Sequence, residues 1–218
     1  QFTSEGSSGF SVRGGNTDQN LILLDEATVY NASHLLGFFS VFNNDAIKDV
    51  KLYKGDIPAR AGGRLASLLD VRMKEGNNKQ FHGTGGIGTI SSRLTLEGPI
   101  IKDKASFLLS GRRTYADIFL PFAQDTAIRD NALFFYDLNG KVNYTLNENN
   151  RIYLSGYYGK DVFENDFAGM RFGNRTFSLR WNHLFSKRLF SNFTLVNSRY
   201  FYDLGTPEGE IPFFNWNS

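Results

Sequence analysis

The stretch FFYDLNGKVNYTL, residues 134–146, alternates between apolar and polar side chains. Apolar residues or glycine occupy the even positions: Phe134, Tyr136, Leu138, Gly140, Val142, Tyr144 and Leu146. Polar residues follow at the odd positions: Asp137, Asn139, Lys141, Asn143 and Thr145. Successive side chains of a β-strand point to opposite faces, so this period of two predicts one long strand with an apolar face and a polar face.

The same pattern continues on both sides of this strand and predicts a series of hairpins. Residues 147–150 (NENN) are a turn signal, and alternation resumes at residues 152–159. Two more short turns are expected at residues 101–104 and 186–188, giving about six strands between His82 and Tyr202. Residues 114–131 and 160–174 are expected to be long polar connections. The apolar parity changes within residues 193–202, which predicts a bulge or a register change there.

Long strands joined by alternating short and long connections are typical of outer-membrane barrels rather than of soluble sandwiches. Aromatic residues make up 15% of the chain and crowd the predicted strand ends, as girdles at two lipid interfaces would require. Those residues are Tyr144 and Phe185 near short turns, and Tyr115, Tyr158 and Phe163 near long connections. The fold class expected for this part is mainly β: antiparallel strands of an incomplete transmembrane β-barrel.

Composition excludes several other classes of function. The net charge of +2 gives no basic surface for nucleic acid, and the absence of cysteine excludes a disulfide framework or a thiolate site. His34, His82 and His183 share no metal-ligand spacing, and the carboxylates at 161, 164 and 166 are interpreted as solvated loop residues. No nucleophile motif is present. We therefore expect no metal, no cofactor and no enzyme activity.

A second regime precedes the strands. Residues 75–79 (EGNNK) interrupt every apolar pattern, and short apolar runs at 21–24, 47–53 and 65–71 lie before them. Residues 32–43 are compatible with a short helix or a loop. These observations divide the chain into residues 1–76, a small mixed domain, and residues 77–218, the barrel strands. The chain starts at Gln1 without a leader and stops within strand-like sequence, so both ends are interpreted as cuts.

The small domain carries a family resemblance. Residues 9–31 (GFSVRGGNTDQNLILLDEATVYN) and 46–76 (AIKDVKLYKGDIPARAGGRLASLLDVRMKEG) resemble the plug domain of TonB-dependent outer-membrane receptors. The resemblance is to receptors of Bacteroidetes-like bacteria in particular. Five elements occur in the family's order, at residues 12–15, 23–26, 47–55, 60–63 and 65–74. The residues that carry the motif are Gly14, Gly15, Asp25, Gly55, Gly62 and Gly63. Glu26, Lys48, Lys51 and Ala61 depart from the family pattern.

The resemblance implies a small α+β plug domain enclosed by the barrel of a nutrient receptor in the bacterial outer membrane. Arg13 and Arg60 match the two plug arginines that pair with barrel-wall glutamates in the family; those glutamates would lie in later strands that this chain does not contain. The plainer interpretation is that both arginines are solvated residues of the lumen.

The resemblance also implies partners. They are outer-membrane lipid, a small nutrient ligand (a metal chelate, a vitamin or a saccharide), a surface lipoprotein, and a TonB-ExbB-ExbD-type energising complex that acts through a segment absent here.

Two other functions remain open on sequence grounds. A soluble secreted β adhesin or glycan-binding module would share the alternation, and an enzyme inside a β-barrel would need a nucleophile, an acid and a base in its lumen. The faces of residues 134–146 separate these functions from the membrane receptor. The membrane interpretation requires the odd, polar set to point inward and the even, apolar set to point outward.

Overall fold

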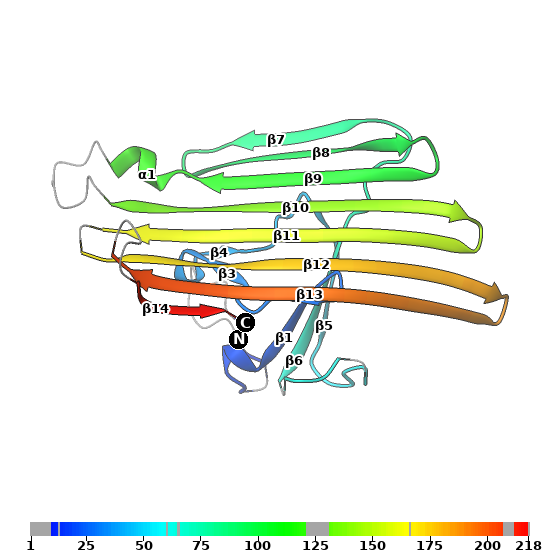
Figure 1. Cartoon of the computed structure of the whole chain (residues 1–218), viewed down its shortest axis with the longest axis horizontal. Coiled ribbons are helices and arrows are strands. Elements are labelled where there is room, and N and C mark those ends of the chain that lie inside the picture. Colours follow the sequence, from blue (N-terminus) through cyan, green and yellow to red (C-terminus); the bar gives the residue numbers. More distant parts are fainter. Residues whose placement is uncertain are drawn as a thin grey trace.

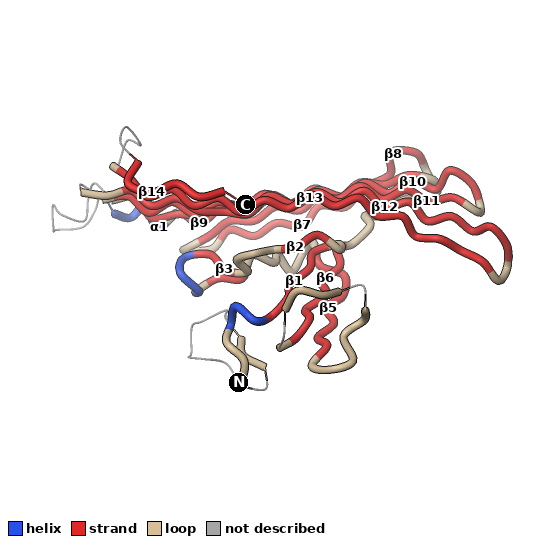
Figure 2. The backbone as a smooth tube through the Cα atoms, turned by 60° about the horizontal axis from the view of Figure 1, so that its bottom comes forward, coloured by secondary structure: helices blue, strands red, loops and turns tan. Residues whose placement is uncertain are grey.

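The computed structural model describes residues 10–12, 14–59, 61–64, 66–120, 131–165, 167–206 and 212–217. In these ranges the strands form an eight-stranded sheet, a four-stranded sheet and a two-stranded sheet. We call the eight-stranded one the large sheet and the four-stranded one the small sheet. The long strands of the large sheet lie side by side in chain order, and the small sheet covers one of its faces (Figures 1 and 2).

The small sheet is mixed, with strand order β2-β1-β6-β5. Its strands are β1 (Asn20–Leu24), β2 (Ala27–Thr28), β5 (Ile47–Tyr53) and β6 (Ser67–Met73). β1 is parallel to β6, and the other two pairs are antiparallel. Asp25 and Glu26 form the two-residue turn between β1 and β2, with φ values of 46° and 74°. Positive φ at both central residues is what a type I′ hairpin requires, so Glu26 adopts here a backbone conformation that usually favours glycine.

Residues 32–43, for which the sequence left a helix or a loop open, contain a small antiparallel hairpin. β3 (Ser33–His34) and β4 (Phe39–Ser40) flank the 3-10 helix η2 (Leu35–Gly37). A second 3-10 helix, η1 (Thr17–Gln19), precedes β1. The N-terminal segment, residues 10–76, therefore combines a mixed sheet with short helical turns.

The large sheet is an antiparallel meander with strand order β14-β13-β12-β11-β10-β9-β8-β7. Its strands are β7 (His82–Ile87), β8 (Ser91–Ile101), β9 (Ala105–Thr114), β10 (Ala132–Asn147), β11 (Asn150–Glu164), β12 (Gly169–Ser186), β13 (Leu189–Gly205) and β14 (Pro212–Asn217). Short helix α1 (Ala116–Phe119) follows β9. In the described part of the chain, no helix is long and apolar enough to cross a membrane.

The strand count expected from the sequence was too low. Residues 82–98 form parts of two strands rather than one, because the chain turns at residues 88–90, where the Gly88 amide donates to the Ser91 carbonyl at 2.9 Å. β14 adds a further strand after β13. The glycines in GTGGIG obscured this turn, since glycine suits both a crowded strand and a sharp reversal.

Two further expectations about the strands were wrong. The connection between β11 and β12 is residues 165–168, not 160–174, and it is closed by the Asn165 amide donating to the Ala168 carbonyl at 3.0 Å. The register of β13 against β12 is regular from Phe190 to Gly205, without the bulge or register change expected there, and it shifts only beside the turn, between Leu184 and Ser186. The polar residues among 160–164 suggested a loop, but Asp161 is 1% exposed on the inner face and Glu164 accepts a hydrogen bond from Arg171 Nε of β12 at 2.7 Å.

The expected faces of β10 are confirmed. Asp137, Asn139 and Lys141 are 0%, 3% and 4% exposed beneath the N-terminal segment, whereas Leu138 is 56% exposed on the opposite face. We call the covered face the inner face and the other the outer face. The outer face carries large exposed apolar side chains along neighbouring strands, among them Leu94, Leu96, Leu109, Leu154, Phe177 and Leu195. The even-numbered residues of β10 are thus not packed in a two-sheet core.

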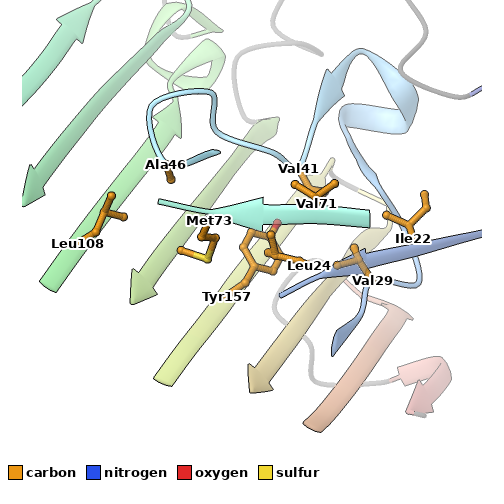
Figure 3. Packing of buried hydrophobic residues seen from close by; sticks show 9 residues of the cluster. All are labelled: Ile22, Leu24, Val29, Val41, Ala46, Val71, Met73, Leu108 and Tyr157. Carbon is orange, nitrogen blue, oxygen red and sulfur yellow. The ribbon is translucent and has the colours of Figure 1, made fainter. Parts of the chain in front are cut away.

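The hydrophobic core lies between the two sheets (Figure 3). Seven of its buried residues come from the N-terminal segment: Ile22, Leu24, Val29, Val41, Ala46, Val71 and Met73. Leu108 of β9 and Tyr157 of β11 complete it from the inner face. The stabilising free energy of apolar burial is roughly proportional to the area removed from water. Because part of that area is buried against the large sheet, the small sheet depends on the large sheet for part of its stability.

Candidate functional site

The feature with the densest buried polar chemistry is the interface between the N-terminal segment and the inner face of the large sheet. Ionisable side chains that are buried nearly always need a partner, because removing a charge from water costs several kcal/mol. At this interface the ion pairs His34–Asp161 and Lys141–Asp25 have partners from opposite sides, so they tie the N-terminal segment to strands of the large sheet.

His34, at the end of β3, is the centre of the first group of contacts. Its Nδ1 lies 2.6 Å from Asp161 Oδ2 of β11, and its Nε2 lies 3.5 Å from Asp137 Oδ2 of β10. The Tyr157 hydroxyl lies 3.2 Å from Nε2, and the ring stacks on Phe135 with centroids 4.2 Å apart. Asp161 Oδ1 also accepts a hydrogen bond from the Leu35 amide at 2.7 Å. The side chains of His34, Asp137 and Asp161 are at most 2% exposed.

Arg112 of β9 extends this group. Its Nε and Nη2 donate to Asp137 Oδ2 at 2.8 and 2.6 Å, and Nη2 also donates to the Ser40 carbonyl of β4 at 2.7 Å. We call His34, Arg112, Asp137 and Asp161 the His34 cluster. With His34 protonated, the cluster holds two positive and two negative charges. It is then neutral as a whole, which is the condition under which buried charges are least costly.

The electrostatics favour that protonated form. Burial by itself lowers the pKa of His34, but the hydrogen bonds with Asp137 and Asp161 and the negative charges of both carboxylates outweigh it. The net result is a pKa raised above the ordinary value of 6.5.

A second buried ion pair lies at the turn between β1 and β2. Lys141 Nζ of β10 is 2.9 Å from Asp25 Oδ2, with side chains 4% and 9% exposed, and it also donates to the Met73 carbonyl at 3.0 Å. The other carboxylate oxygen of Asp25 accepts from the Met73 amide at 3.2 Å. Lys141 therefore fixes the β1–β2 turn and the end of β6 at once.

More exposed pairs and neutral hydrogen bonds surround these two groups. Arg180 lies 3.2 Å from Glu26, and Arg93 lies 2.9 Å from Asp45. Asn174 of β12 accepts from the Tyr30 amide at 3.1 Å and donates to the Asn31 carbonyl at 2.7 Å. These contacts extend the interface to β12 and β8, so that it reaches most of the width of the large sheet.

After β6 the chain leaves the small sheet through Gly76, whose backbone lies in close contact with the backbone of β9. Ser106 Oγ donates to the Glu75 carbonyl at 2.8 Å and lies 3.2 Å from the Gly76 carbonyl. Gly76 has φ of 81°, and a Cβ placed on it would overlap the Phe107 carbonyl. Only glycine satisfies both conditions.

Replacing Gly76 by alanine should therefore destabilise the protein by about 1–3 kcal/mol, through backbone strain and the displaced Phe107 carbonyl. Equilibrium unfolding of the full-length variant measures this loss. Gly62→Ala is the matched control, because a Cβ on Gly62 meets nothing within 4 Å. Equal losses from both substitutions would contradict the packing described for Gly76.

The structure brings few of the sequence-predicted site residues together. Arg13 and Arg60 lie outside the described residues. Asp25 belongs to the interface. Gly14 and Gly63 have φ of 77° and 98°, in the region that favours glycine, and a Cβ on Gly15 would lie 2.7 Å from Ala66 Cβ. Gly15 and Gly55 also line a pocket of about 410 Å³, whose lining residues come before β1, after β5 and before β6.

Sequence reasoning missed the residues that form the interface. The inward parity of Asp137 and Lys141 was the available signal, since a buried aspartate and a buried lysine on one strand require partners outside that strand. Nothing in the local sequence marked His34 or Arg112. Asp161, interpreted as a loop carboxylate, is on the inner face of β11 and 1% exposed.

No protein-family model and no curated protein matches this chain. Solved structures match it in fold. The siderophore receptor PirA from Acinetobacter baumannii aligns over 98% of this chain and 38% of its own, with 15% identity and a TM-score of 0.63. A mutant of the ferric enterobactin receptor PfeA from Pseudomonas aeruginosa aligns over 97% and 39%, with 14% identity and a TM-score of 0.65.

The outer membrane transporter YddB from Escherichia coli aligns over 92% of this chain and 35% of its own, with 13% identity and a TM-score of 0.63. The chain thus spans between 35% and 39% of the length of these three structures. At such identities the likeness concerns the fold. The chain has the fold of one part of these receptors and transporters: a small domain against antiparallel strands of an incomplete barrel.

Proposed function

We propose that the chain is part of a TonB-dependent outer-membrane receptor, with residues 1–76 as its plug domain and residues 77–218 as strands of its barrel. The observation that carries this proposal is the opposite character of the two faces of the large sheet. Its inner face pairs charged and polar side chains with the N-terminal segment, whereas its outer face exposes leucines and aromatic residues. A wall between lipid and a plugged lumen needs this division.

The same observation argues against a soluble adhesin or glycan-binding module. A soluble sheet with one free face presents polar side chains on it, and contiguous apolar patches on soluble monomers are rarely large. The solved structures with a similar fold are described as receptors and transporters, which supports transport rather than catalysis.

In this proposal the interface holds the plug in its resting position. A TonB-ExbB-ExbD-type complex would pull on a segment that precedes the plug. The ion pairs at Asp25 and His34 would resist this pull, and they would have to break before the plug could move. Arg13 and Arg60 would add contacts with glutamates of later barrel strands. The nutrient would be a metal chelate, a vitamin or a saccharide. A surface lipoprotein would assist its capture. The Bacteroidetes-like source of the protein stays a prediction.

Uptake by the full-length protein tests this function. Cells that express it are supplied with iron chelates, corrinoids and oligosaccharides, with and without a working TonB gene. We expect one class to be taken up, and uptake to stop without TonB. Recovery of the protein in the aqueous fraction after detergent-free lysis, together with no uptake of any class, would overturn the proposal.

A further inference from the structure

The His34 cluster differs from the other contacts of the interface in containing a group that titrates near neutral pH. Among ionisable side chains, the imidazole of histidine is the one whose ordinary pKa lies within the physiological pH range. The cluster also joins three strands of the large sheet, β9, β10 and β11, to the β3–β4 hairpin. A change of charge at His34 therefore acts on a contact between two parts of the molecule.

We propose that the His34 cluster is a proton-dependent latch, in which the protonated imidazole bridges Asp137 and Asp161 and holds the β3–β4 hairpin against the large sheet. The latch adds a means of regulation to the interface. It rests on the proposed function only for its consequence in transport, because the docking of the hairpin is a property of the folded chain.

The geometry distinguishes the two protonation states. In the imidazolium form, Nδ1–H donates to Asp161 and Nε2–H points at Asp137, and the cluster is neutral. In the neutral form, Nδ1–H still donates to Asp161, while Nε2 accepts from the Tyr157 hydroxyl 3.2 Å away. Loss of the proton therefore removes the contact with Asp137 and leaves one uncompensated negative charge in a buried site. Among the residues that the structure describes, the other titratable or charged groups that face the ring are Tyr157 and, through Asp137, Arg112.

The surroundings hold the ring in this place. Phe135 stacks on it with an interplanar angle of 5°, and Gly159 lies beside it without a side chain. A Cβ on Gly159 would overlap the Tyr157 hydroxyl and approach His34 Cε1 to 3.0 Å. The imidazole consequently has little freedom to turn away when its charge changes.

The direction of the effect follows from linkage between protonation and docking. The undocked imidazole has the ordinary pKa of about 6.5, and docking raises it. Docking is therefore strongest below pH 6.5 and weakens as the pH rises through the raised pKa. Because one proton is involved, the docking constant falls by at most about tenfold per pH unit in that window and is constant outside it.

Hydrogen–deuterium exchange on the full-length protein in detergent measures the latch. The reporters are amides at the β3–β4 hairpin, in particular that of Leu35, which donates to Asp161. After correction for intrinsic exchange, we expect protection in the wild type to fall by up to about tenfold per pH unit between pH 6.5 and the raised pKa of His34. His34→Gln should show no such fall. His82→Gln, which alters an exposed histidine of β7, should behave as the wild type.

Two further measurements keep the proposal testable if His34→Gln does not fold. Asp161→Asn removes one of the carboxylates that favour the imidazolium and should narrow the pH window. NMR titration of the His34 ring in the wild type should give a pKa above 6.5. A flat wild-type profile, or an unchanged pH dependence in His34→Gln, would overturn the latch.

These readouts separate the latch from the proposed function. A protein that takes up a nutrient but whose hairpin protection does not change with pH would exclude the latch alone. A protein with a pH-dependent hairpin that takes up nothing would exclude the receptor function and leave the latch standing.

Discussion

Replacing Lys141 by methionine should destabilise the folded protein by about 3–5 kcal/mol, because it leaves the Asp25 carboxylate buried without its partner. Methionine matches the length of lysine and removes the charge, so packing changes little. Asp25 is 9% exposed at its side chain and cannot recover its hydration without moving the β1–β2 turn. That turn also bonds the Met73 amide, so the end of β6 would loosen with it.

The double variant Lys141→Met with Asp25→Asn separates loss of the partner from loss of the lysine. Asparagine removes the negative charge and keeps an oxygen for the Met73 amide, so the double variant should regain most of the lost stability. The free energies of unfolding are measured by denaturant unfolding of the full-length protein in lipid vesicles, with hydrogen exchange of the small-sheet amides as the signal.

Arg180→Met is the matched control. It also removes a cation that faces a carboxylate of the N-terminal segment, but Glu26 is 38% exposed at its side chain and water can replace the arginine. The expected loss is about 0–1 kcal/mol. If Lys141→Met and Arg180→Met cost the same, or if Asp25→Asn restores nothing, the Lys141 pair does not have the role assigned to it.

The fold was predictable where the sequence pattern was long and unbroken. β10 alternates over residues 134–146 and β11 over residues 152–159, and their hairpin and faces follow from that pattern. Prediction failed where residue type was ambiguous. Glycine suits both strand and turn at residues 83–88, and polar residues at 160–164 suit both a loop and an inner face. Local sequence contains no information that separates these alternatives, because the partner that decides them lies elsewhere in the chain.

The interface was predictable only in part, and for the same reason. Asp137 and Lys141 were placed on an inward face by parity alone. Their partners His34 and Asp25 were not, because both lie in the N-terminal segment and only its docking on the large sheet brings them to β10. Asp25 was identified through the plug motif, with no indication that it pairs with Lys141. The sequence thus locates charges that need partners, and the tertiary fold decides which partners they have.

Leu138→Arg should cost the membrane-inserted protein about 2–4 kcal/mol, because it places a charge on the outer face near the middle of β10. Leu138 is 56% exposed there, with Gly111 and Tyr158 opposite it on the two neighbouring strands. In a soluble protein a half-exposed leucine tolerates arginine at little cost, since the guanidinium reaches water. A large loss therefore requires that hydrocarbon surrounds the outer face.

Leu146→Arg provides the depth control on the same strand. Leu146 is 45% exposed next to the turn at residues 148–149, where arginine reaches the lipid headgroups, so its cost should be about 0–1 kcal/mol. Unfolding in vesicles of defined thickness measures both values. Similar small costs at the two positions would mean that the outer face does not lie in lipid, and the receptor proposal would lose the observation on which it rests.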